Sequence, residues 1–132
     1  MKLVKFKTQQ PSNGVLPGKI GSKNSEGERI LTWALLFAVL CHNLACLWFL
    51  VGELAEDGWV MRYNYTHSDK GEQYVAAIYF IVTTITTVGY GDITGGGGSA
   101  AEQAFGIFLM LIGVVSYSVA LSSFMSAISA LN

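Results

Sequence analysis

Charged side chains are scarce in this sequence. Aspartate, glutamate, lysine and arginine together make up 13% of its 132 residues, and residues 30–51 and 103–132 contain none of them. Hydrophobic residues make up 52%, a balance that is apolar-rich for a soluble domain and favours a membrane protein. The net charge of −1 gives no reason to expect nucleic acid as a partner.

Cysteine is also scarce. Cys41 and Cys46 are the only two, and both lie in the first apolar stretch. On a helix they would face different directions, so an internal disulfide is implausible. The two cysteines have no metal-ligand spacing, and His42 and His67 lie in different environments. Because no nucleophile–base pair or metal set is evident, we expect neither an enzyme nor a cofactor.

The first apolar stretch predicts an outer transmembrane helix over about residues 30–52. As a helix, residues 30–51 would extend about 33 Å, enough to cross a hydrocarbon core of about 30 Å. His42 and Asn43 interrupt the stretch near its centre, where polar groups usually turn toward protein. We expect His42 to be a hydrogen-bonded packing residue, with proton sensing as the alternative.

The second apolar stretch predicts an inner transmembrane helix over about residues 101–131. Residues 104–131 alone would extend about 42 Å, so this helix must tilt, bend or protrude from the bilayer. No proline follows Pro17, which leaves Gly106 and Gly113 as its flexible points.

Residues 1–28 are polar and predict a cytoplasmic N-terminal segment or linker. Most basic residues precede the first apolar stretch, which places this end of the chain in the cytoplasm. With two spans, the C-terminal end lies on the same side. No signal peptide is evident, because no short apolar core and cleavage site follow the basic start MKLVKFK.

Two different segments separate the spans. Residues 53–71 are polar and belong in water, and Asn64 begins a match to a glycosylation acceptor. Residues 72–86 are largely apolar or threonine but too short to cross a bilayer, which is the length expected of a re-entrant half-helix.

The segment TVGYGD, residues 87–92, follows this half-helix. Non-helical backbone at membrane depth is tolerated only where it is buried in protein or lines an aqueous path. Gly89 and Gly91 can adopt positive φ, and together with the residues between them they permit alternating backbone handedness. Successive carbonyl oxygens can then point toward one axis. Four such strands would form rings of oxygens that replace the water shell of a dehydrated cation.

The neighbours of this segment have expected roles of their own. The C-terminal end of the half-helix carries a partial negative charge of about half an electron, which would favour a cation nearby. Asp92 either adds negative charge at the outer mouth or braces the loop by hydrogen bonds, and we favour bracing. Residues 93–103, which include GGGGS at 95–99, predict a flexible connector.

The phrase TTVGYGD, residues 86–92, resembles the filter signature of the potassium channel family at every position. Residues 35–53 and 101–128 are similar to the outer and inner pore helices of the ether-à-go-go and cyclic-nucleotide-gated group, particularly its members in ciliates. The resemblance implies an all-α membrane protein with two transmembrane helices, a re-entrant pore helix and a selectivity-filter loop. It also implies a homotetrameric pore domain, residues 29–132, that conducts potassium passively in the plasma membrane.

The resemblance also implies roles for single residues. Potassium ions would lie at the backbone carbonyls of the filter, with the Thr87 hydroxyl as a further ligand. The filter residues would be Thr87, Val88, Gly89, Tyr90 and Gly91. Two flanking residues, Thr86 and Asp92, would support the filter. Gly113 matches a glycine where inner helices bend, with close helix packing as the alternative. Tyr117 matches an aromatic that contacts pore blockers in the cavity, with packing between helices as the alternative.

The sequence departs from this group in ways that put gating in doubt. The arginine-bearing voltage-sensing helices and the cytoplasmic cyclic-nucleotide-binding domain are absent from it. The stretch KLVKFK resembles a remnant of a linker, and GGGGS resembles an engineered one. A weakly selective cation pore and a non-conducting membrane subunit are the competing interpretations.

Overall fold

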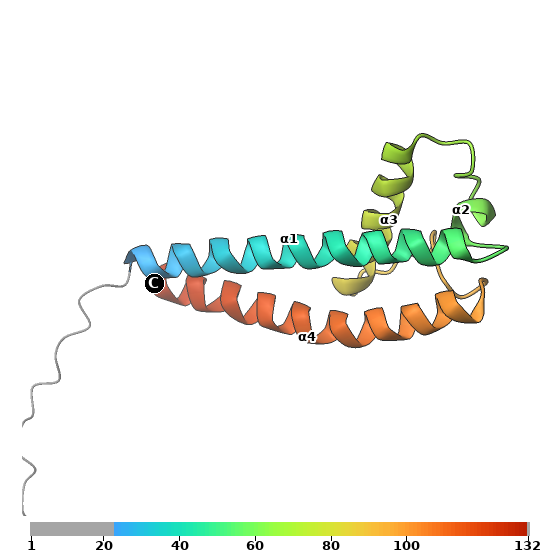
Figure 1. Cartoon of the computed structure of the whole chain (residues 1–132). Coiled ribbons are helices and arrows are strands. Elements are labelled where there is room, and N and C mark those ends of the chain that lie inside the picture. Colours follow the sequence, from blue (N-terminus) through green and yellow to red (C-terminus); the bar gives the residue numbers. More distant parts are fainter. Residues whose placement is uncertain (1–22, 132) are drawn as a thin grey trace, which may run out of the picture.

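The computed structural model describes residues 23–131, which form two long helices joined by a shorter helical insertion (Figure 1). The elements in chain order are α1 (Lys23–Leu54), α2 (Trp59–Arg62), α3 (Lys70–Ile85) and α4 (Ala100–Leu131). No strand occurs among these described residues. The all-α prediction is confirmed.

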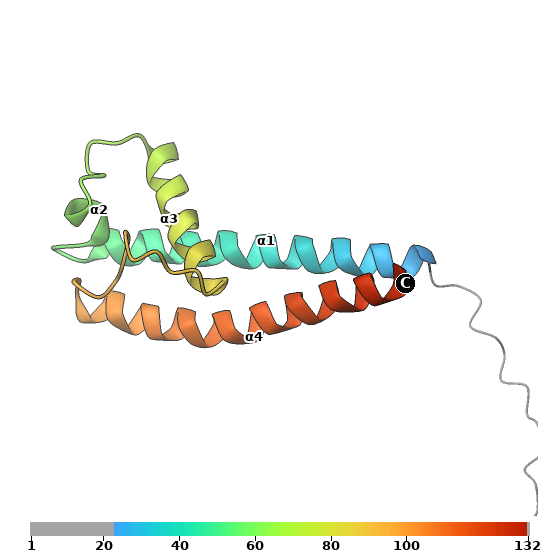
Figure 2. The same cartoon turned by 180° about the vertical axis from the view of Figure 1, so that it is seen from behind.

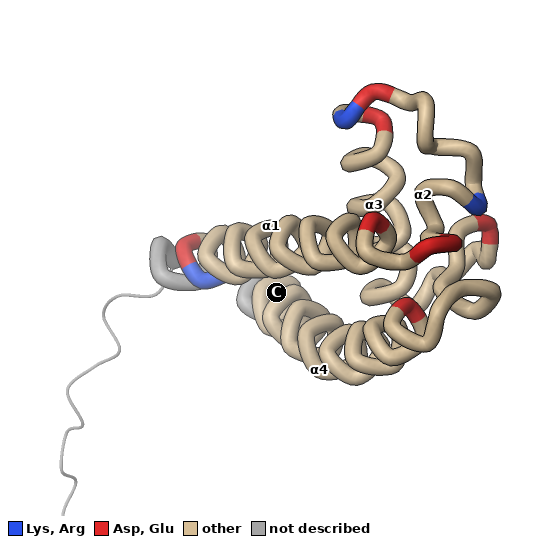
Figure 3. Tube along the Cα trace, turned by 45° about the vertical axis from the view of Figure 1, so that its right-hand side comes forward, with Lys and Arg blue, Asp and Glu red and all other residues tan. Residues whose placement is uncertain are grey.

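α1 and α4 lie side by side and run in opposite directions (Figures 1 and 2). Each has 32 residues, a length of about 48 Å. Two segments, Gly27–Leu54 in α1 and Ala100–Ser129 in α4, are long and apolar enough to cross a membrane by length and composition. Figure 3 shows charged residues near the coloured start of α1, at the start of α3 and where α1 ends and α4 begins, while the long middle parts of α1 and α4 carry none.

α1 begins at Lys23, earlier than the sequence predicts. The expected linker over residues 1–28 is therefore helical from residue 23 onward. Gly27 does not interrupt the helix, which continues directly into the apolar stretch. The segment KLVKFK lies outside the described residues.

The core forms where the four helices meet near the junction of α1 with the insertion. Each helix contributes one large aromatic ring to a stack around Trp48 of α1. The ring of Trp48 lies 5.9 Å from Trp59 of α2, 4.5 Å from Phe80 of α3 and 5.6 Å from Phe105 of α4, between ring centroids. Trp48 and Trp59 are fully buried. This stack holds α3 across the two long helices.

α3 has a defined start and a defined end. Asp69 is its N-cap, and the Asp69 carboxylate accepts a hydrogen bond from the Gly71 amide at 3.2 Å. The helix ends at Ile85, and a non-helical segment follows at once. The half-helix predicted over residues 72–86 therefore exists as α3, shifted by one to two residues.

Candidate functional site

The segment after α3 alternates in backbone handedness. Positive φ angles occur at Thr87 (63°), Gly89 (51°) and Gly91 (78°), and not at the two residues between them, Val88 and Tyr90. Both glycines have the positive φ that the sequence predicts. Thr87 was not expected to share it, because a β-branched residue in the left-handed region is strained.

The C-terminal turn of α3 holds this segment by its carbonyl groups. The Thr87 amide donates to the Thr84 carbonyl at 3.1 Å, and the Gly89 amide donates to the Thr83 carbonyl at 2.9 Å. The Thr86 hydroxyl donates to the Val82 carbonyl at 2.7 Å. The last carbonyls of the helix are thus bonded to the segment itself, which fixes its direction and offsets the strain at Thr87.

Asp92 braces the far side of the segment. Its Oδ2 accepts a hydrogen bond from the Tyr79 hydroxyl at 2.7 Å, and its Oδ1 accepts one from the Ile93 amide at 3.0 Å. The Tyr79 hydrogen bond is the main cause of a pKa for Asp92 below its ordinary value. Of the two roles considered for Asp92, this geometry favours bracing, because α3 and the segment are tied together on both sides.

Replacing Tyr79 with phenylalanine is expected to make the segment more sensitive to acid. Without the hydroxyl, the pKa of Asp92 rises toward its ordinary value, so the carboxylate protonates at a higher pH than in the parent. In this variant the only hydrogen bond left on the carboxylate is the one from the Ile93 amide, which is strong above that pKa and weakened below it. A pH titration of current through the purified protein should therefore lose conduction at a higher pH in Tyr79→Phe. In an Asp92→Asn background, Tyr79→Phe should not shift the pH at which current is lost. An equal shift in that background would show that Asp92 is not the group responsible.

Arg62 ties the insertion to the segment that follows Asp92. Its Nη1 donates to the Thr94 carbonyl at 3.3 Å, and its Nη2 donates to Glu102 Oε2 at 2.6 Å and to the Asp57 carbonyl at 2.8 Å. The hydrogen bond to Glu102 raises the pKa of Arg62 above its ordinary value. The neighbouring Tyr63 hydroxyl accepts a hydrogen bond from the Thr94 amide at 2.9 Å.

Glu102 is the centre of this network, although it lies in the first turn of α4. Its side chain is fully buried, and its Oε1 accepts a hydrogen bond from the Trp59 amide at 2.7 Å. The Glu102 amide in turn donates to the Ser99 hydroxyl at 3.3 Å. Sequence reasoning did not identify Glu102 or Arg62. The Ser-x-x-Glu spacing of Ser99 and Glu102 is a helix-start signature that could have drawn attention to Glu102.

Two of the four glycines at 95–98, Gly95 and Gly98, are closely packed. A Cβ at Gly98 would overlap Glu102 Oε2, and a Cβ at Gly95 would lie 3.1 Å from the Glu102 carbonyl oxygen and 3.3 Å from the Trp48 ring. The expectation of a flexible connector at these residues is therefore wrong. These two glycines let the backbone pass close to Glu102, which a larger residue would prevent.

The remaining residues singled out in the sequence lie apart from this network. His42 Nδ1 is 2.7 Å from the Tyr74 hydroxyl, as expected of a hydrogen-bonded packing residue. Asn64 is exposed with a φ of 61°. Tyr117 is half-buried on α4. At Gly113, α4 continues unbroken, and a Cβ would lie 3.2 Å from Ile85 Cα. That distance favours close helix packing for Gly113.

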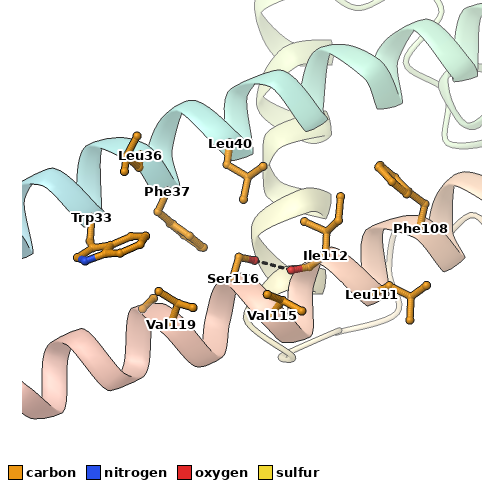
Figure 4. Close-up of a pocket in the computed structure, with 11 residues that line it drawn as sticks. Trp33, Leu36, Phe37, Leu40, Phe108, Leu111, Ile112, Val115, Ser116 and Val119 are labelled. Atoms are coloured by element: carbon orange, nitrogen blue, oxygen red, sulfur yellow. Dashed lines mark hydrogen bonds between the residues drawn. The ribbon is translucent and has the colours of Figure 1, made fainter.

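Two cavities border α4. One, of 550 Å³, lies between α4 and the segment that follows α3, and its lining includes Thr87, Gly89 and Met110. The other, of 580 Å³, is an apolar groove between α1 and α4 (Figure 4). The groove's one hydroxyl, on Ser116, donates to the Ile112 carbonyl at 2.7 Å and is thus satisfied within its own helix.

The family model described as "Ion channel" matches residues 49–130, which include α2, α3, the segment after α3 and nearly all of α4. The chain therefore belongs to the ion channel family. With its two apolar helices, it is a membrane protein.

The relatives it matches share a narrower description. A voltage-gated inwardly rectifying potassium channel, KCNH7 of Mus musculus, is 33% identical over 101 residues, covering 63% of this chain and 8% of the relative. KCNH6 of Homo sapiens, with the same description, is 32% identical over 62% of this chain and 10% of the relative. A voltage-gated delayed rectifier potassium channel, KCNH4 of Homo sapiens, is 30% identical over 64% of this chain and 10% of the relative. The chain thus spans a tenth or less of the length of these relatives.

Proposed function

We propose that this chain forms a potassium-selective pore that conducts the ion passively across a membrane. The observation that carries the proposal is the alternating handedness of Thr87–Gly91 at the end of α3. Alternation turns successive carbonyl oxygens the same way, as in the TVGYG loops whose carbonyls replace the hydration shell of potassium in its channels. The relatives' description as potassium channels supports the same ion.

The pore requires more than one copy of the chain. One chain supplies one strand of the filter, and a closed ring of carbonyls needs four, so we propose a homotetramer. The exposed side chains of Val88 and Tyr90 and the many exposed apolar residues of α4 are consistent with surfaces that neighbouring copies and lipid cover.

Further roles follow from this proposal. Ions would lie at the carbonyls of the filter, Thr87 to Tyr90, and potassium would be the permeant ligand rather than a cofactor. Tyr117 would face the central cavity that four copies enclose and contact pore blockers there. The protein would lie in the plasma membrane with both termini in the cytoplasm. Asn64 would then be on the extracellular side, where it could accept a glycan.

The direct test is the reversal potential of the purified protein in a planar bilayer, with potassium on one side and sodium on the other. A value near the potassium equilibrium potential is expected. A value near zero with clear current would instead identify a weakly selective cation pore. No current from protein that is correctly inserted as a tetramer would contradict conduction by this chain alone and favour a subunit of a larger channel.

A further inference from the structure

The apolar groove between α1 and α4 is a large surface that the chain itself leaves uncovered. It has a volume of 580 Å³, and all of its lining residues belong to the two membrane-spanning segments. Figure 4 shows Phe37 and Leu40 of α1 pointing toward α4 across it. Leu36, Leu111 and Val115, which also line the groove, are each more than half exposed. An uncovered apolar surface of this kind indicates a binding partner.

The walls of the groove offer almost nothing to a polar ligand. The Ser116 hydroxyl is already bonded to the Ile112 carbonyl of its own helix at 2.7 Å. Figure 4 shows the indole nitrogen of Trp33 at the end of the groove nearest the start of α1. The other lining side chains are hydrocarbons. A polar molecule would lose its hydrogen bonds in such a groove, so the fitting occupant is a hydrocarbon chain.

The length of the groove matches one leaflet of a bilayer. On α1 its lining lies within residues 33–40, which are about 6 to 17 Å along the helix from Arg29. On α4 its lining lies within residues 108–120, a length of about 18 Å. Half of a hydrocarbon core is about 15 Å thick. The groove therefore extends from the membrane interface to about the middle of the bilayer.

The interfacial end of the groove carries groups that suit a phospholipid headgroup. Trp33 is 41% exposed, and tryptophan is enriched at the level of the headgroups. Arg29 is exposed and lies one helical turn before Trp33, on the same face of α1. A guanidinium group binds phosphate through charge-assisted hydrogen bonds. A phosphate beside Arg29 would thus continue into an acyl chain that enters the groove.

We propose that this groove binds one acyl chain of a phospholipid from the leaflet at the start of α1, with the lipid phosphate beside Arg29. A side chain from a neighbouring copy would fill only part of a groove about 18 Å long, whereas an acyl chain runs along its whole length. The observations that carry the proposal are the apolar walls, the length of one leaflet and the Arg29–Trp33 end.

The site goes beyond the proposed pore function and does not depend on it. The bound chain would contact both long helices at once, so α4 would not move toward α1 without expelling it. Ile112 lines the groove, and the next residue, Gly113, packs against Ile85 at the end of α3. The lipid would therefore lie close to the point where α4 meets the half-helix.

The test is native mass spectrometry of the full chain in detergent, titrated with palmitoyl-oleoyl phosphatidylglycerol. We expect one tightly bound lipid per chain. Ser116→Phe places a ring in the groove and should weaken the affinity about tenfold or more, the effect of leaving two methylene groups unburied. Ser118→Phe is the matched control and should bind like the parent. The Ser118 hydroxyl also donates within α4, to the Val114 carbonyl at 2.6 Å, but its side chain is exposed and lies outside the groove.

Two further comparisons test the two ends of the lipid. Arg29→Gln should weaken the affinity about fivefold, because it removes one positive charge near the headgroup. Dihexanoyl phosphatidylglycerol has the same headgroup but chains too short to fill the groove, so its affinity should be far lower. Leu36→Trp fills the groove from α1, and Leu35→Trp, at an exposed neighbour outside the lining, is its control.

Three results would overturn the proposal. Equal affinity in Ser116→Phe and Ser118→Phe would place the lipid outside the groove. Equal affinity for the short-chain lipid would show that the headgroup alone is bound. Dissociation of the oligomer in Ser116→Phe, with lipid binding unchanged, would show that a neighbouring copy covers the groove. Far-ultraviolet circular dichroism identifies any variant that fails to fold, and the Leu36→Trp and Leu35→Trp pair then decides the question.

Discussion

Replacing Glu102 with alanine is expected to lower the free energy of unfolding by about 3–5 kcal/mol. Glu102 is fully buried, and the change leaves the Trp59 amide without its acceptor. It also removes the carboxylate of Arg62, whose side chain is 20% exposed. Breaking a buried ion pair by removing one partner has an effect of about this size, because the remaining charge is left uncompensated. Denaturant unfolding in detergent, followed by the fluorescence of the buried tryptophans, would measure it.

The chain contains a matched control for this variant. Glu53 forms an ion pair with Lys70 at 2.8 Å, a distance close to the 2.6 Å of the Arg62–Glu102 pair. The side chains of Glu53 and Lys70 are 48% and 71% exposed, so solvent screens this pair. Glu53→Ala should therefore change stability by at most about 1 kcal/mol. Equal losses in the two alanine variants would contradict the central position given to Glu102.

Replacing Gly89 with alanine is expected to abolish potassium-selective current. Gly89 has a φ of 51°, where a residue with a Cβ is less stable by about 1–2 kcal/mol. Thr87 already has this strain two residues earlier, so a second strained residue is expected to turn the backbone of the segment. The carbonyls would then no longer share one direction. The reversal potential between potassium and sodium is the measurement, and it should move toward zero or the current should vanish.

Gly106 provides the comparison for this second variant. A Cβ at Gly106 meets nothing within 4 Å, and the same is true at Gly89, so neither alanine is crowded within the chain. Gly106 lies inside α4 with an ordinary helical backbone. Gly106→Ala should therefore leave selectivity intact. Normal selectivity in Gly89→Ala would show that positive φ at this position is not required for the filter.

Much of the fold could be predicted because the membrane imposes strong local patterns. The stretch 30–51 carries no charge along a length that matches the bilayer, and α1 contains it. The sequence predicts an inner helix from about residue 101, and α4 begins at Ala100. Gly89 and Gly91 mark positive φ because they are the residues that adopt it with least strain.

The supports of the site could not be predicted, because they depend on pairs far apart in the sequence. Arg62 and Glu102 are 40 residues apart, and each alone resembles an ordinary surface charge. The positive φ of Thr87 depends on hydrogen bonds to α3 that no residue type signals. The glycines at 95–98 are typical of a flexible linker by composition, and their packing depends on where Glu102 lies in space.

Because Glu102 is held in place at one end of α4, a small tilt of the helix produces a large displacement at its other end. Glu102 anchors one end of the helix to the insertion, while the far end lies beside the start of α1 (Figure 2). From Glu102 to Ser129 the arm is about 40 Å long, so a tilt of about 5° about the anchor would displace its tip by about 3–4 Å. A small rotation of α4 about Glu102 thus moves the C-terminal end of the helix by about the width of a water molecule. Thr94, which lies beside Glu102, hardly moves.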